Sequence, residues 1–100
     1  MKIKYEPKIS VIVATYNQER FIGRCLRSLL QQTVPHYEYE IIVVNDGSDD
    51  RTKYALELFC GPSDSVVQVH TNETNCGLPA ALNRGLHAAK PPYVVRVDAA

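Results

Sequence analysis

The segment Glu40–Thr52, with the sequence EIIVVNDGSDDRT, joins a hydrophobic run directly to a cluster of acidic residues. The four aliphatic side chains at 41–44 are typical of a strand that is buried on both faces of a sheet. Asp46, Asp49 and Asp50 follow this strand at once. Carboxylates in such a place either cap the next helix or bind a ligand.

Strand-like and helix-like segments alternate on both sides of this stretch. Short hydrophobic runs predict strands at 9–14, 39–45, 66–70 and 93–97. Apolar residues at helical spacing lie between them, in a first helix ending at Gln32, a second beginning at Ser48 or Asp49, and a third beginning near Leu78. This alternation predicts an α/β fold, with a parallel sheet in a three-layer β-α-β-α-β-α-β arrangement and right-handed crossovers.

Local signals refine the expected elements. Asn17 is expected to cap the first helix, and Pro79 lies where the first turn of the third helix tolerates proline. Gly47 is expected to have a positive φ or to lie against another backbone segment. The residues expected to face the core from the second helix are Tyr54, Ala55, Leu58 and Phe59.

The composition is that of one globular domain. Of the 100 residues, 45% are hydrophobic and 22% are charged, which is usual for a folded domain of this size. We expect an N-terminal tail at 1–8 and a single domain at 9–100. Eleven basic and eleven acidic side chains cancel, and the basic ones are scattered, so nucleic acid is not an expected partner.

No membrane segment or secretion signal is expected in the chain. No stretch approaches the ~20 apolar residues of a spanning helix, and the charged N-terminus is not followed by an apolar run. Cys25, Cys60 and Cys76 are odd in number and form no C-x-x-C pair, which argues against disulfides and a zinc site. These features predict a cytoplasmic protein.

Ligands of parallel α/β sheets bind beyond the carboxyl ends of the strands. The loops expected there are 15–18, 45–50, 71–77 and the segment from 98 onward. No G-x-G-x-x-G and no G-x-x-x-x-G-K-[ST] motif occurs, which excludes a dinucleotide-binding turn and a P-loop. The acidic second loop suits hydrogen-bond donors, such as base N–H groups and ribose hydroxyls, or a divalent cation.

The acidic residues divide into two groups. Asp49 and Asp50 fall at the expected start of a helix, so capping is their favoured role. Asp46 ends a strand ahead of that helix, and Asp98 repeats this placement after the fourth strand. These two are expected on neighbouring loops, as a rim for a metal ion or a nucleotide diol. Tyr16, in the first loop, either stacks on a base or covers the end of the sheet.

Three segments together resemble the start of family 2 glycosyltransferases with the GT-A fold. They are ISVIVATYNQERFIGRCLRSLLQQT, EIIVVNDGSDDRT and NCGLPAALNRGLHAAKPPYVVRVDA, in the expected order within Lys8–Ala99. The resemblance implies the Rossmann-like N-terminal half of that fold. It also implies transfer of a sugar from a nucleotide diphosphate sugar, often a UDP-sugar, to an acceptor hydroxyl with inversion. The implied acceptor is a sugar or a lipid-linked glycan.

The resemblance also implies the binding residues. The residues that it places at the nucleotide are Thr15, Tyr16, Asp46, Asn83, Gly85 and Asp98. Asp46 would hydrogen-bond the base, and Asp98 would hold the ribose and a bridging Mg²⁺ or Mn²⁺. A cation there offsets the diphosphate charge and stabilises the leaving group.

The sequence departs from the family pattern at several positions. Ala14 stands for the usual proline, Asn45 for the first acid of a pair, and Ala100 for the second acid of the metal motif. The base that deprotonates the acceptor is expected beyond residue 100. The chain is therefore interpreted as a donor-binding half, truncated at the metal motif and inactive alone. The alternative is a non-catalytic nucleotide-binding or interaction module, and an exposed sheet edge predicts self-association as a homo-oligomer.

Overall fold

The computed structural model describes residues 7–60, 66–90 and 92–99. Of the predicted N-terminal tail, positions 1–6 lie outside the described residues, while the backbone N–H of Lys8 donates to the carbonyl of Glu38 at 2.7 Å. The elements in chain order are β1 (Ile9–Thr15), α1 (Ile22–Leu30), a 3-10 turn (His36–Glu38), β2 (Tyr39–Asp46), α2 (Thr52–Glu57), β3 (Val67–Asn72), α3 (Leu78–Ala88) and β4 (Tyr93–Arg96).

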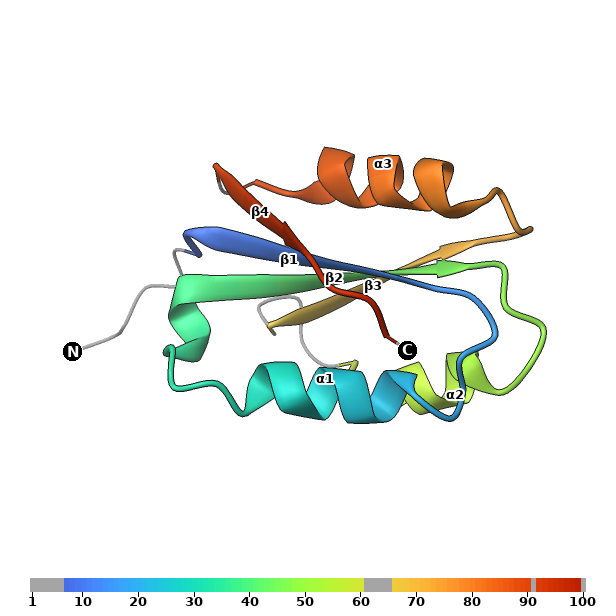
Figure 1. The fold of residues 1–100 in the computed structure, drawn as a ribbon, viewed down its shortest axis with the longest axis horizontal. Helices are drawn as coiled ribbons and strands as arrows, with labels where there is room; N and C mark the ends of the chain where they lie inside the picture. The colour runs from blue at the N-terminus through green and yellow to red at the C-terminus, as the bar shows by residue number, and fades with distance from the viewer. Residues whose placement is uncertain (1–6, 61–65, 91, 100) are drawn as a thin grey trace.

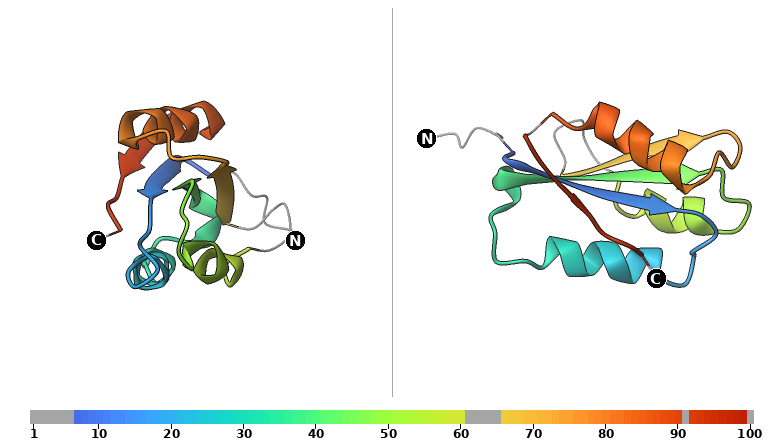
Figure 2. Two further views of the ribbon diagram at one scale, coloured as in Figure 1. Left: turned by 90° about the vertical axis from the view of Figure 1, so that its right-hand side faces the viewer. Right: turned by 45° about the horizontal axis from the view of Figure 1, so that its top comes forward.

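The four strands form one parallel sheet in the order β3-β2-β1-β4. Helices α1 and α2 cover one face of this sheet and α3 covers the other (Figure 1). The end-on view in Figure 2 shows the three layers. The predicted parallel α/β fold is therefore confirmed. Within the described part of the chain, no helix has both the length and the apolar character needed to cross a membrane.

The strand order corrects one expectation. Asp46 follows β2 and Asp98 follows β4, but β1 lies between these two strands. The two acidic loops are therefore not direct neighbours. Because β2 and β3 extend to one side of β1 and β4 lies on the other, the strand order reverses at β1, and such a switch point opens a crevice at the carboxyl ends.

Strand β2 is the centre of the fold, and all eight of its residues are buried. Its side chains alternate between the two faces, as in any strand. Ile41 and Val43 pack with Leu26 and other residues beneath α1 and α2. Ile42 and Val44 belong to a smaller cluster around Ala81, beneath α3. The hydrophobic run at 41–44 thus supplies both layers of the core.

Helix α2 differs from the expectation in its start and in its buried face. It begins at Thr52 rather than at Ser48 or Asp49. Leu56 is its buried apolar residue, whereas Tyr54 is 63% exposed and Leu58 is 82% exposed. The predicted apolar face was therefore wrong at these two exposed positions. It was correct at Ala55 and Phe59, which are partly buried and pack against the core below α1 and α2.

The expected cap of α1 was also wrong. Phe21 occupies the N-cap position and makes no side-chain cap hydrogen bond. Asn17 has a left-handed backbone, with a φ of 52°. Its Oδ1 accepts hydrogen bonds from Asp49 and Asp50 in another loop. An asparagine that readily adopts positive φ is suited to such a tertiary role.

Helix α3 lies close to β1 at a glycine. Gly85 is buried, and a Cβ atom added to it would lie 2.6 Å from Cγ2 of Ile12. Glycine is therefore required here by the close approach of the helix to the strand, as often occurs where a helix packs directly on a sheet.

Replacing Gly85 by alanine is expected to lower the free energy of unfolding by about 1–2 kcal/mol, because overpacking outweighs the better helix propensity of alanine. Gly23→Ala in α1 is the matched control. Its Cβ would meet only the movable end of Arg27, at 3.2 Å from Nη1, so it should stabilise the protein by about 0.5–1 kcal/mol. Urea unfolding of the three proteins measures both effects, and equal shifts in the two variants would contradict the packing argument.

Candidate functional site

A pocket of about 500 Å³ opens at the carboxyl ends of the strands, on the α3 side of the sheet. Its lining residues are Ala14, Thr15, Tyr16, Gln18, Asp46, Asn75, Gly77, Leu78, Ala81, Arg96, Asp98 and Ala99. Four of the six residues that the sequence placed at the nucleotide are therefore brought together: Thr15, Tyr16, Asp46 and Asp98. The other two, Asn83 and Gly85, lie on α3 outside this lining, and Gly85 packs on the sheet.

The carboxylate of Asp46 organises one wall of the pocket. It is 3% exposed, and each of its oxygens accepts two hydrogen bonds. Oδ1 accepts from Asn72 Nδ2 at 2.8 Å and from the backbone N–H of Cys76 at 3.0 Å. Oδ2 accepts from Asn75 Nδ2 at 3.1 Å and from the backbone N–H of Gly77 at 2.9 Å. A single buried side chain thus holds the whole segment that connects β3 to α3.

These hydrogen bonds keep Asp46 ionised. Burial acts to raise its pKa, but the hydrogen bonds from Asn72, Cys76 and Gly77 outweigh burial and lower the pKa below its ordinary value of 3.8. Asn72 is held in turn by Arg84 of α3, whose guanidinium donates to Oδ1 of its amide. The amide of Asn72 is thereby oriented with its N–H group toward the carboxylate.

Gly47 brings the loop after β2 against the same segment. Its φ is 70°, and a Cβ atom there would lie 2.4 Å from the carbonyl carbon of Thr74. Both expectations for this glycine, a positive φ and a close backbone approach, are confirmed. Any side chain at this position would push Thr74 and Asn75 away from Asp46.

The loops after β1 and β2 are tied together by hydrogen bonds between their backbones and side chains. The backbone N–H of Asn17 donates to Ser48 Oγ at 3.0 Å, and that of Gln18 donates to Thr52 Oγ1 at 3.0 Å. Asp50 accepts from the N–H of Thr52 at 2.9 Å and from the N–H of Glu19 at 3.3 Å. The N-cap position of α2 is Arg51, which makes no side-chain cap hydrogen bond. The capping expected of Asp49 and Asp50 is therefore reduced to the bond from Thr52 to Asp50, and Asp50 also anchors the first loop.

The first loop offers an aromatic side chain to the pocket. Tyr16 lines the pocket and is 44% exposed. Thr15, directly before it, is buried and donates from Oγ1 to Gln18 Oε1 at 2.8 Å. This bond holds the turn that presents Tyr16. An aromatic ring in such a position can stack on a planar ligand.

At the other side of the pocket, Asp98 is paired with a cation of the protein. Arg96 donates from Nε to Oδ1 of Asp98 at 3.2 Å, and its Nη2 lies 3.2 Å from the same oxygen in an ion pair. Asp98 could supply one carboxylate ligand to a metal ion. Among the described residues, however, no three His, Cys, Asp or Glu side chains are grouped so that they could hold a metal ion. The residues described do not by themselves fit a metal centre.

Sequence reasoning missed two contributors to the pocket. Asn75 belongs to the loop 71–77, which was expected at the ligand-binding edge of the sheet, but its own role follows only from its hydrogen bond to Asp46. Arg96 was read only as part of a strand. The spacing of Arg96 and Asp98 was a usable signal, because residues i and i+2 of an extended segment point to the same face.

Replacing Asp46 by asparagine is expected to lower the free energy of unfolding at pH 7 by about 3 kcal/mol, because an amide cannot accept all four hydrogen bonds. The lowered pKa means that the wild-type carboxylate contributes fully above pH 3.8 and loses this contribution as pH falls through its lower, folded-state value. Urea unfolding should therefore show a difference between the two proteins that shrinks at low pH.

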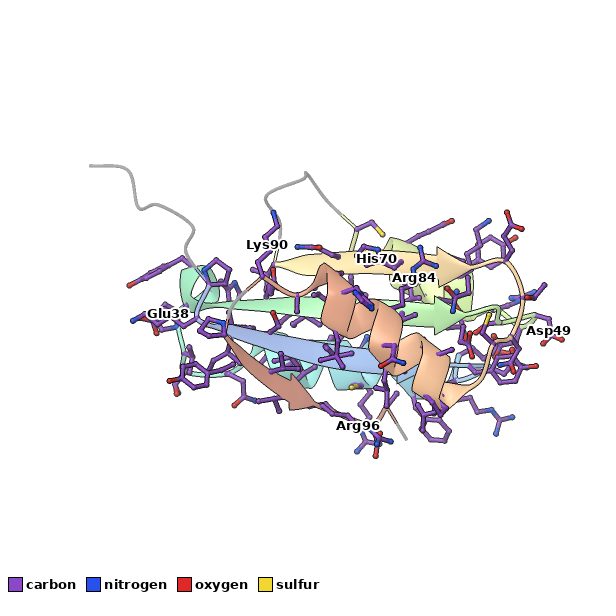
Figure 3. All side chains as sticks on the ribbon, turned by 90° about the horizontal axis from the view of Figure 1, so that it is seen from above. Glu38, Asp49, His70, Arg84, Lys90 and Arg96 are labelled. Carbon is purple, nitrogen blue, oxygen red and sulfur yellow. The ribbon has the colours of Figure 1, made fainter. Side chains whose placement is uncertain are left out.

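The control for this experiment is Asp49→Asn. Asp49 lies exposed beyond the carboxyl ends of the strands (Figure 3), so its replacement should change stability by less than about 0.5 kcal/mol. Equal losses for the two variants at pH 7 would mean that Asp46 does not hold the loop.

Comparison with known proteins gives this arrangement its context. The sequence profile of the family described as glycosyl transferase family 2 matches residues 10–99. An uncharacterized glycosyltransferase of Bacillus subtilis, EpsJ, is 40% identical over 92 residues, which are 92% of this chain and 26% of that protein. The chain thus spans about a quarter of the length of this relative.

Two solved structures have the same fold over nearly the whole chain. Residues 1–349 of Staphylococcus aureus TarS, in complex with UDP, match with a TM-score of 0.82 and 39% identity, covering 92% of this chain and 27% of that one. The mannosyltransferase PcManGT of Pyrobaculum calidifontis, in complex with GDP-Man and Mn²⁺, matches with a TM-score of 0.84 and 31% identity, covering 95% and 28%. By its sequence from residue 10 to residue 99 and by its fold, the chain belongs to glycosyltransferase family 2.

Proposed function

We propose that this chain is the donor-binding part of a glycosyltransferase that takes its sugar from a nucleotide diphosphate sugar, and that UDP is the nucleotide. The main support is the convergence of Thr15, Tyr16, Asp46 and Asp98 on one pocket at the carboxyl ends of the strands. The UDP and UDP-GlcNAc complexes of TarS, which is 39% identical, add support from a related protein.

Within this proposal, Tyr16 stacks on the base and Asp46 orders the wall beside it. Both oxygens of Asp46 already accept two hydrogen bonds from the segment 72–77. A direct bond from the base to this carboxylate would require one of these donors to move. The amide of Asn75 and the turn around Gly77 are therefore the polar groups of this wall that face the pocket.

The proposed role of the chain is binding rather than transfer. The carboxylates that line the pocket in the described residues are Asp46 and Asp98. Asp46 is held by the loop, and Asp98 is paired with Arg96. In this proposal Asp46 holds the loop and Asp98 serves the phosphate side of the pocket, so inverting transfer to a sugar or a lipid-linked glycan depends on groups outside the described residues.

A divalent cation enters this proposal through Asp98 alone. Mn²⁺ accompanies GDP-Man in the complex of PcManGT, and Mg²⁺ or Mn²⁺ would neutralise the charge of a diphosphate. Asp98 would supply one ligand to such an ion. Donor binding is otherwise assigned to the protein's own side chains.

Calorimetric titration of UDP into the 100-residue chain tests the proposed function. Tyr16→Ala is expected to weaken UDP binding about tenfold, since loss of base stacking on an aromatic ring removes about 1–3 kcal/mol, and Tyr16→Phe should retain the affinity. Tyr54→Ala is the matched control, because Tyr54 is 63% exposed and lies outside the pocket lining. A wild-type chain that binds no UDP would refute the proposal.

Self-association through β4 is a second expected property. All four residues of this edge strand are exposed, and Tyr93, Val94 and Val95 are 68%, 41% and 46% accessible. An exposed edge of this kind pairs readily with a second copy. Sedimentation should show a molar mass that rises with concentration. Val95→Lys should suppress this rise, while Leu58→Lys, directly after α2, should not. A mass that stays monomeric at all concentrations would contradict this expectation.

A further inference from the structure

The charged groups that line the pocket are not equally available to a ligand. In the part of the chain that the structure describes, they are Asp46, Arg96 and Asp98. Asp46 is buried and its oxygens are occupied by donors of the loop. The side chains of Arg96 and Asp98 are 51% and 71% exposed. Arg96 is thus the cationic side chain of this lining.

The fold places Arg96 on the side of the sheet where the pocket opens. Arg96 is the last residue of β4 and pairs in register with Ile12 of β1, and neighbours in register project to the same face. Ile12 contacts α3 at Gly85, so Arg96 lies on the α3 face as well. Figure 3 shows Arg96 at the free edge of the sheet, beside β4.

Asp98 orients the guanidinium of Arg96, and a phosphate could replace this carboxylate as its partner. Its Nε donates to Oδ1 of Asp98 at 3.2 Å, and its Nη2 lies 3.2 Å from the same oxygen. These two N–H groups form the planar fork that binds phosphate oxygens. An exposed ion pair contributes little net free energy, so an incoming phosphate can displace the carboxylate at low cost.

We propose that Arg96 binds the diphosphate of the nucleotide ligand and that Asp98 holds the guanidinium in place until the ligand arrives. This inference rests on the proposed function and adds to it the group that neutralises the phosphates. It also explains how phosphate charge can be neutralised in this pocket. Its described residues supply one candidate metal ligand, Asp98, and this carboxylate is paired with Arg96. When the ligand binds, its phosphate replaces the Asp98 carboxylate as the anionic partner of Arg96.

The test compares ligands that differ only in their phosphates. UDP, uridine and inorganic pyrophosphate are titrated into the 100-residue chain and into Arg96→Gln, in a metal-free buffer of low ionic strength that contains a chelator. We expect Arg96→Gln to weaken the binding of UDP about tenfold, the effect of one charge-assisted contact, and to leave uridine binding unchanged. Pyrophosphate binding should fall by a similar factor.

Two variants sharpen the comparison. Arg27→Gln removes the same charge from the exposed surface of α1, outside the pocket lining, and should bind all three ligands as the wild type does. Asp98→Asn releases Arg96 and should strengthen the metal-free binding of UDP a few-fold. Weaker UDP binding by this variant would contradict the proposed role of Asp98. Circular dichroism verifies that each variant is folded.

The outcomes separate this inference from the proposed function. Equal losses of UDP and uridine in Arg96→Gln would overturn it, because the side chain would then shape the pocket rather than bind phosphate. Unchanged UDP and pyrophosphate binding would overturn it too, while leaving nucleotide binding established. If the wild type binds pyrophosphate through Arg96 but neither UDP nor uridine, the phosphate site is supported and the proposed nucleotide function fails.

Discussion

The hydrogen bonds to the Asp46 carboxylate are the interaction on which the pocket depends. This side chain stands at the end of the central strand, where it is buried against the segment that leads into α3. A carboxylate removed from water must find donors within the protein, since an unpaired buried charge is very costly. The segment 72–77 adopts the conformation that provides four such donors. One wall of the pocket and the start of α3 are therefore consequences of the same requirement.

A second set of bonds joins the loops after β1 and β2. Asn17, Ser48, Asp50 and Thr52 each take part in a bond between the two loops. In sequence these residues look like local helix caps, because short polar side chains often fill that role. Here the same side chains accept donors from a neighbouring loop. These bonds keep the turn that presents Tyr16 close to the end of β2.

Features that depend on a few consecutive residues could be predicted from the sequence, whereas features that depend on contacts between distant segments could not. The strand predicted at 39–45 and the special backbone of Gly47 could be read locally, since a long hydrophobic run indicates a buried strand and a glycine between a strand and a helix indicates a turn. The exposure of Tyr54 and Leu58 was not predictable, because it depends on where α2 begins and ends. The packing role of Gly85 could likewise be recognised only from the structure. A glycine within a helix is recognised as a packing residue only when its neighbour, Ile12, is known.

The alternation of strands and helices, the parallel sheet, and the family motifs that mark the ends of β1, β2 and β4 could all be recognised from the sequence. These properties follow from hydrophobic periodicity and from short motifs, both of which lie within a few consecutive residues. The strand order, the partners of Asp46 and the meeting of Tyr16, Asp46 and Asp98 in one pocket became known only from the folded protein. Polar groups from distant parts of the chain meet only when their strands are placed side by side. A buried carboxylate such as Asp46 then selects its hydrogen-bond donors from the loops around it. No stretch of sequence holds that information alone.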